Sequence, residues 1–183
     1  MQEDKDLFYI WAWTFELVKG IFIFLAILVL IHFFIATVFV VDGISMEPNF
    51  HDGEYVLVDK ISYTVGEPHR GDAVILKFPG DPEHKKYIKR IIGLPNEKLQ
   101  IDNNRIYIND QPINEFYIDE TVQTLPNTTI ELGKNEYYVV GDNRENSNDS
   151  RVWGACPKKD IIGKATIIIL PPKNFSTIPQ IQY

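Results

Sequence analysis

The sequence contains very little cysteine: Cys156 is the single thiol in 183 residues. One thiol excludes an internal disulfide and a zinc site built from several cysteines. Basic side chains are also scarce, because 18 Lys and Arg stand against 25 Asp and Glu, for a formal net charge of −7. A nucleic-acid-binding surface needs clustered Lys and Arg, so nucleic acid is not an expected partner. The sequence also lacks a Walker loop and a Gly-x-Gly-x-x-Gly run, the usual signals of nucleotide binding.

One long apolar run is present. Residues 21–41, IFIFLAILVLIHFFIATVFVV, are apolar except for His32 and Thr37. As a helix, this run reaches about 31 Å, enough to cross a hydrocarbon core of about 30 Å. A cleaved signal peptide has a shorter apolar region and an Ala-x-Ala-like site, and no Ala-x-Ala occurs here. We therefore predict a short N-terminal segment, 1–20, and a retained membrane anchor at 21–41. Too few basic residues lie near the span to fix its orientation.

The remainder, residues 42–183, is typical of a mainly β protein. Short runs of alternating or branched residues, separated by Gly and Pro, predict strands at 54–60, 72–78, 85–92, 98–101, 105–108, 136–142 and 164–170. The Asn103-Asn104 pair indicates a hairpin turn. This spacing favours an all-β domain with an antiparallel, barrel- or sandwich-like sheet. Residues 110–135 are interpreted as a looser insertion and 171–183 as a Pro-rich tail.

A serine follows the apolar run closely, in the stretch GISMEPNF at 43–50. A loop serine need not be chemical, so a candidate nucleophile needs a base. His51, His69 and His84 lie in no motif that connects them to Ser45, and short groups such as HDGE lack metal-ligand spacing. No metal site is therefore predicted. The other base known to activate serine is a neutral lysine.

The strand KKYIKRII at 85–92 offers such a lysine. With a period of two, Tyr87, Lys89 and Ile91 share one face. If that face is buried, the Lys89 ammonium is disfavoured and its pKa falls by up to about 3–5 units. Alternatively, Lys89 is one of four basic residues on an exposed edge strand.

A third stretch, GDNRENSNDSRVWG at 141–154, places many polar side chains directly after a predicted strand. It could be an Asx-rich turn that is held together by side-chain-to-backbone hydrogen bonds. It could also supply the hydroxyl and the carboxylate–guanidinium pair that a buried amine requires for its orientation.

Four blocks occur in order behind the apolar run: GISMEP, RGDAVILKF, YIKRIIGLP and GDNRENSNDSRVWG. This set resembles the bacterial type I signal peptidases, a family of Ser–Lys proteases. The resemblance implies that Ser45 is the nucleophile and Lys89 the general base. It further implies that Ser147 hydrogen-bonds the lysine nitrogen and that Asp149 with Arg151 braces the loop.

The chain departs from the family pattern in places. Asn49 stands where Thr is usual, and GLPNE at 93–97 stands where many members have GLPGD. Gly43 stands where some members carry a serine oxyanion donor, so we expect backbone N–H groups of Ser45 and Gly43 to form the oxyanion hole. Met46 and Tyr87 are expected to line the substrate pocket, and no cofactor is expected.

The resemblance also implies a single-pass protein of the bacterial cell membrane, with its N-terminus in the cytoplasm and residues 42–183 outside. The implied partners are the lipid bilayer and preproteins with small residues before the cut, and the export machinery is a further candidate. Two other hypotheses remain. One is a self-cleaving repressor-type Ser–Lys protease, against which stands the absence of a DNA-binding segment. The other is a catalytically inactive, membrane-tethered β module that binds exported chains.

Overall fold

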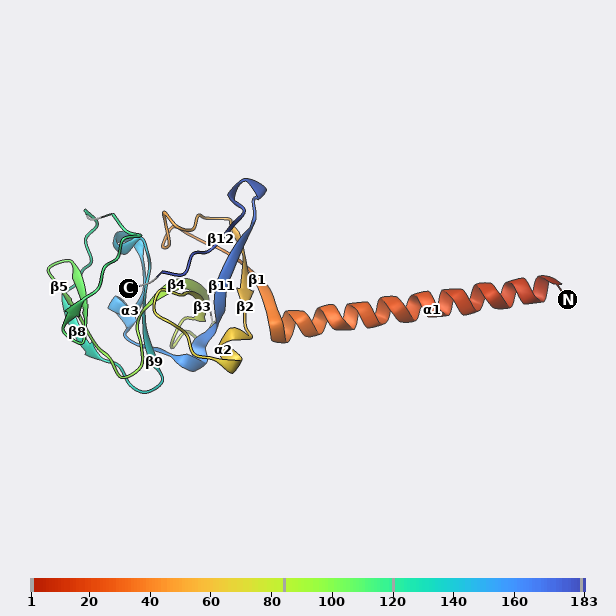
Figure 1. Cartoon of the computed structure of the whole chain (residues 1–183), viewed down its shortest axis with the longest axis horizontal. Helices are drawn as coiled ribbons and strands as arrows, with labels where there is room; N and C mark the ends of the chain where they lie inside the picture. Colours follow the sequence, from red (N-terminus) through yellow and green to blue (C-terminus); the bar gives the residue numbers. More distant parts are fainter. Residues whose placement is uncertain (1, 84, 120, 182) are drawn as a thin grey trace.

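The structure is a computed structural model that describes residues 2–83, 85–119, 121–181 and 183. A long helix projects from a β domain (Figure 1). Helix α1 covers Gln2–Leu30, a π-helical turn covers Ile31–Ile35, and strand β1 follows at once as Ala36–Val40. From Trp11 to Ile35 the helix is long and apolar enough to cross a membrane, and its side chains are exposed on all sides.

The apolar run expected at 21–41 therefore does not form one helix. Its last part, Ala36–Val40, pairs antiparallel with β2, Tyr55–Asp59, along its whole length. The helix instead begins well before residue 21, because Trp11 and its neighbours continue the apolar surface toward the N-terminus. Lys60 joins the helix end to the domain, since its backbone N–H donates to Ile35 O at 2.9 Å and its Nζ to His32 O at 3.0 Å.

The main sheet is antiparallel and runs in the order β1-β2-β11-β3-β4-β9-β10, and β12 pairs with β11. Its further strands are β3 (Ala73–Lys77), β4 (Lys86–Gly93), β9 (Glu136–Val140), β10 (Cys156–Pro157), β11 (Ile161–Leu170) and β12 (Ser176–Thr177). The mainly β, antiparallel prediction is confirmed. Strand β4 lies between β3 and β9 in this order, although β9 pairs with it only from Arg90 onward. Lys89 is 2% exposed, so it is not one of the exposed basic residues of an edge strand.

A second, smaller sheet has the order β7-β6-β5-β8. Its strands are β5 (Lys98–Asp102), β6 (Arg105–Ile108), β7 (Gln111–Pro112) and β8 (Thr128–Glu131). The predicted hairpin is present, because Asp102 pairs with Arg105 and both Asn103 and Asn104 have positive φ. Two of these strands lie inside the segment interpreted as an insertion, and its described residues between 113 and 127 form no helix or strand.

Short helical turns connect the strands: α2 (Ser62–Val65), α3 (Ser150–Trp153) and the 3₁₀ turns Arg144–Asn146, Lys158–Asp160 and Pro172–Asn174. Apolar side chains form one core cluster beneath the serine segment, with Met46, Phe50 and Ile88, and another beneath the second sheet, with Leu99 and Ile106. Strand β4 contributes to both clusters, through Ile88 and Ile92. It therefore fixes how the serine segment and the second sheet lie relative to each other.

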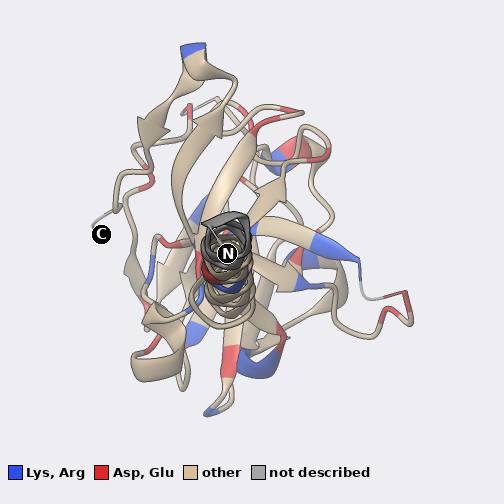
Figure 2. Ribbon diagram, turned by 90° about the vertical axis from the view of Figure 1, so that its right-hand side faces the viewer, with Lys and Arg blue, Asp and Glu red and all other residues tan. Residues whose placement is uncertain are grey.

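Charged residues are mixed over the domain. Figure 2, a view along α1, shows acidic and basic segments scattered over the domain behind the helix.

Candidate active site

Ser45 and Lys89 meet although 44 residues separate them along the chain. Lys89 Nζ donates a hydrogen bond to Ser45 Oγ at 2.6 Å and another to Ile88 O at 3.0 Å. Strand β4 carries the lysine, and a turn at Ser45–Asn49 carries the serine. The carbonyl of Met46 closes this turn, because it accepts hydrogen bonds from the backbone N–H groups of Asn49 and Phe50. The structure thus brings the predicted nucleophile and base into direct contact.

The lysine is buried, with 2% of its surface exposed. Burial lowers the pKa of Lys89 to about 8, while the charges of Asp149 and Asp142 oppose this shift and that of Arg151 adds to it. About one amine in ten is then neutral at pH 7. The ring of Tyr87 lies 5.4 Å from Nζ and covers part of the amine. Burial therefore raises the share of the neutral form, which a base requires, far above that of an exposed lysine.

Two buried ion pairs stand beside the amine. Arg151 binds Asp149 through Nε at 2.9 Å and Nη2 at 2.8 Å, and Arg90 binds Asp142 through Nε at 2.8 Å. All four side chains are at most 4% exposed. Burial raises the pKa of Asp149, but Arg151, the Gly141 N–H and Ser147 together outweigh burial and hold the pKa below its usual value. Each arginine pairs with a carboxylate that stabilises the lysine's positive charge, and so offsets part of that effect. The expected Asp149–Arg151 pair is present.

Gly141 lies between the two ion pairs and the serine. Its N–H donates to Asp149 Oδ2 at 2.9 Å, and a Cβ at this position would overlap both Ser147 Oγ and Ser45 O. The next residue but one, Asn143, donates its backbone N–H to Ser45 O at 3.1 Å. The 141–151 loop therefore packs directly against the backbone of the nucleophile, and this close approach requires glycine.

Ser147 is not placed as expected. Its hydroxyl is buried, and no described residue, Lys89 included, meets it in good hydrogen-bonding geometry. The hydroxyl still lies near enough to Asp149 to help lower the pKa of that carboxyl. Ser147 thus borders the site without contacting the base.

The expectation that Gly43 supplies an oxyanion donor is wrong for this structure. Gly43 has a φ of +91°, and its N–H is already bound to Asp52 Oδ1 at 2.7 Å. The N–H of Ser45 makes no hydrogen bond to any residue that the structure describes. One of the two expected donors is therefore available.

The two residues expected in the substrate pocket differ in position. The expectation that Met46 lines the pocket is wrong, because its side chain has no exposed surface and packs in the core with Phe50 and Val56. An apolar side chain one residue after the serine points to the opposite side of the turn. Tyr87 is half-buried beside Lys89 and packs on Phe78, with ring centroids 5.4 Å apart, so its position fits a pocket wall.

Two of the three histidines considered as bases have carboxylate neighbours: His51 lies beside Glu47 and His69 beside Asp72, each at 3.8 Å. His84 lies outside the described residues. The lysine is the side chain that meets Ser45 Oγ.

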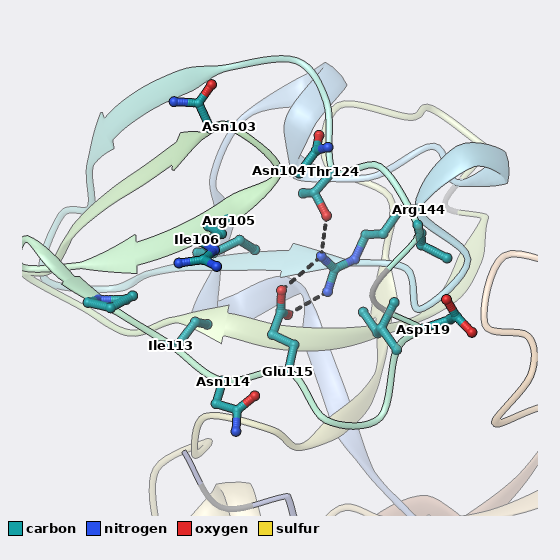
Figure 3. Close-up of a pocket in the computed structure, with 13 residues that line it drawn as sticks. Asn103, Asn104, Arg105, Ile106, Ile113, Asn114, Glu115, Asp119, Thr124 and Arg144 are labelled. Carbon is teal, nitrogen blue, oxygen red and sulfur yellow. Dashed lines mark hydrogen bonds and ion pairs between the residues drawn. The ribbon is translucent and has the colours of Figure 1, made fainter.

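Sequence reasoning missed the side chains that hold the 141–151 loop from outside. Arg144 is 3% exposed; its Nε donates to Gly141 O at 3.0 Å, and its Nη1 donates to Glu115 Oε2 at 3.0 Å and to Thr124 at 2.8 Å. Figure 3 shows Glu115 and Thr124 converging on this guanidinium in a cavity of about 600 Å³. Asn49 Nδ2 similarly donates to Asp142 Oδ2 at 3.0 Å, which is how Asn at this position holds the serine turn.

Replacing Gly141 with Ala tests this close packing. The added methyl group must displace either the Ser147 side chain or the Ser45 carbonyl. We therefore expect the free energy of unfolding to fall by about 1–3 kcal/mol. We also expect the folded variant to react at Ser45 more slowly than the wild type. Chemical unfolding and labelling of Ser45 by a serine-directed electrophile measure the two effects. Glu145→Ala, an exposed change in the same loop, serves as the control. Wild-type stability and labelling in Gly141→Ala would contradict the packing described here.

Comparison with known proteins gives a consistent result. The family described as signal peptidase, peptidase S26, matches residues 14–170. Signal peptidase I of Bacillus licheniformis is 36% identical over 167 residues, which cover 86% of this chain and 89% of that protein. Probable signal peptidase I-1 of Synechocystis is 33% identical over 175 residues, covering 92% and 88%.

Among solved structures, a signal peptidase I from Enterococcus faecalis is 26% identical, with a TM-score of 0.48, covering 54% of this chain and 97% of that one. The family and the two relatives confirm the resemblance found in the four sequence blocks. The chain belongs to the signal peptidase family, peptidase S26, and is a serine peptidase.

Proposed function

We propose that this protein is a membrane-anchored serine endopeptidase that cleaves N-terminal signal peptides from exported preproteins, with Ser45 as nucleophile and Lys89 as general base. Family membership supports signal peptide cleavage by a serine protease. The assignment of Ser45 and Lys89 as nucleophile and base is supported by the 2.6 Å hydrogen bond between Lys89 Nζ, which is buried, and Ser45 Oγ. The inactive β-module hypothesis gives no reason to bury a lysine at this cost.

In the proposed reaction, the neutral Lys89 amine accepts the Ser45 proton as Oγ attacks the carbonyl carbon of the substrate peptide bond. The oxyanion that forms is bound by the free Ser45 N–H. The resulting ammonium then donates its proton to the departing amine. Water, deprotonated by the same amine, attacks the acyl-enzyme carbonyl carbon. As the acyl–Oγ bond breaks, the ammonium returns its proton to Ser45 Oγ and the free amine is restored. Asp149 and Arg151 act as supporting residues that hold the 141–151 loop, which also carries Ser147, against the serine turn.

The pairing of β4 supports an extended substrate. Residues Lys86–Arg90 pair with β3 on one side, whereas on the other side β9 begins to pair only at Arg90. The second edge of Lys86–Lys89 is therefore not covered by any described strand, and it ends at the base. A peptide that adds to this edge presents its backbone to Ser45, with small side chains before the cut against Tyr87.

Helix α1 supports the membrane anchor, because apolar side chains surround it and none packs against the domain from Trp11 to Ile35. We place the N-terminus in the cytoplasm and the β domain outside, where an exported chain emerges. Preproteins and the lipid bilayer are then its partners.

The first test removes the nucleophile and the base. Ser45→Ala and Lys89→Ala should each reduce preprotein cleavage by about 10³-fold or more, and the double variant should be no worse, because the two groups act as one unit. Cleavage by purified, detergent-solubilised protein is followed by sequencing of the new N-terminus. Ser176→Ala and Lys134→Ala, both exposed, serve as matched controls. An inactive wild type would favour the β module, and full activity in either site variant would exclude the dyad.

The second test uses pH. Because only the free amine accepts the serine proton, kcat/KM should rise about tenfold per pH unit below pH 8 and level off above it. The Asp149 carboxylate stabilises the ammonium, so Asp149→Asn should lower the pKa of Lys89 and move the midpoint toward acid, even if the plateau rate falls. Glu83→Gln, an exposed change, should leave the midpoint unmoved. A profile that is flat from pH 6 to 9 in the wild type would argue against a lysine base.

The third test addresses orientation. Protease added to spheroplasts should digest the β domain and leave the N-terminal segment protected. An epitope at each end of the chain and a cytoplasmic marker protein show which side the protease reached. Protection of residues 42–183 in intact spheroplasts would overturn the proposed orientation.

A further inference from the structure

Tyr117 lies in the irregular segment between β7 and β8, far from Ser45 and Lys89 in sequence. It is half-buried and contacts three groups that belong to different parts of the active site. None of the four sequence blocks contains it.

The face of the Tyr117 ring covers an arginine. The guanidinium of Arg90 lies 4.6 Å from the ring centroid, while its edge binds Asp142 and, through Nη1, Gly71 O at 2.8 Å. Arg90 follows Lys89 directly on β4. A ring above the guanidinium limits the movement of Arg90 away from Asp142.

The hydroxyl of Tyr117 is connected to Arg144 of the 141–151 loop through Glu115. It donates to Glu115 Oε1 at 2.7 Å, and Glu115 is the carboxylate that pairs with Arg144. Figure 3 shows this carboxylate facing the guanidinium of Arg144. Arg144 in turn donates to the carbonyl of Gly141, the residue that packs on Ser45.

The backbone of Tyr117 contacts the serine turn itself. Its carbonyl accepts from Asn49 Nδ2 at 3.4 Å, and the same amide nitrogen donates to Asp142. Tyr117 thus connects the base strand, the 141–151 loop and the serine turn.

We propose that Tyr117 is a positioning residue for the Ser45–Lys89 pair, which sets the separation of serine and lysine by stacking on Arg90 and binding Glu115. This role rests on the proposed function. Most of this positioning effect comes from the face of the ring, because the Glu115–Arg144 ion pair does not depend on the Tyr117 hydroxyl. When the stack is lost, Arg90 no longer neutralises Asp142 fully, and the Asp142 carboxylate then favours the charged form of Lys89.

The test compares Tyr117→Leu with Tyr117→Phe in the full-length, detergent-solubilised protein. Tyr117→Leu should lower kcat for preprotein cleavage by about 10–100-fold, because a small displacement of reacting groups has an effect of this size, while KM changes little. The midpoint of its pH profile should move toward alkali. Tyr117→Phe, which keeps the ring, should retain most of kcat and the wild-type midpoint. Phe175→Leu is the matched control, since this ring belongs to another segment and is 65% exposed.

A merely structural role would lower the melting temperature and leave the pH midpoint and the kcat of the folded fraction unchanged, and this result would overturn the proposal. Equal loss of kcat in Tyr117→Phe and Tyr117→Leu would overturn the role of the ring face. If Tyr117→Leu melts below the assay temperature, Tyr117→Met, which keeps more of the side-chain volume, replaces it. If Tyr117→Leu cleaves preprotein with the kcat and the pH midpoint of the wild type, this inference is wrong, while the proposed function is unaffected.

Discussion

The architecture of the active site depends on keeping one amine out of water without leaving any charge beside it unpaired. Lys89 is 2% exposed, and the two carboxylates that influence it most, Asp149 and Asp142, are equally buried. Each is bound by its own arginine. Removal of one member of such a pair leaves a bare charge in a medium of low polarity, which is far more costly than the pair itself. The four side chains are therefore required together.

This requirement explains why one loop contacts so many parts of the chain. The 141–151 loop binds β4 through Asp142, the serine turn through Asn143, and the segment between β7 and β8 through Arg144. Strand β4 supplies both the base and the arginine that follows it. The two sheets are consequently joined through ion pairs as well as through apolar packing.

Much of the fold could be predicted from the sequence because its strands show the period of two and end at Gly, Pro or Asn. The same period placed Lys89 on one face with Tyr87, and its burial follows from that face. Strand β1 could not be predicted, because Ala36–Val40 is as apolar as the helix before it and a continuous apolar run does not distinguish strand from helix. Met46 was misplaced for a related reason: a turn has no fixed period from which the direction of a side chain can be read.

The contacts that complete the site were beyond sequence reasoning for another reason. Asn49 and Asp142 are 93 residues apart, and Tyr117 lies in a segment without periodicity. Nothing local in the chain signals such pairs. The binding of Gly43 N–H to Asp52 is closer in sequence, yet it depends on how the turn closes and not on residue type alone. The roles of Ser45 and Lys89 remain proposals that the geometry supports.

The join between α1 and the domain has a consequence for where a substrate can be cut. Strand β1 starts directly after the helix, is paired over its full length, and is followed by Val41, whose N–H binds Glu54 O. No slack remains between Ile35 and the serine turn. With α1 in a bilayer, Ser45 would stand at one height above the lipid surface, and a peptide bond nearer to the membrane or farther from it would not meet the hydroxyl. The enzyme would then measure distance from the membrane, so that a short exported chain segment is cut at one place even where a suitable small residue occurs twice.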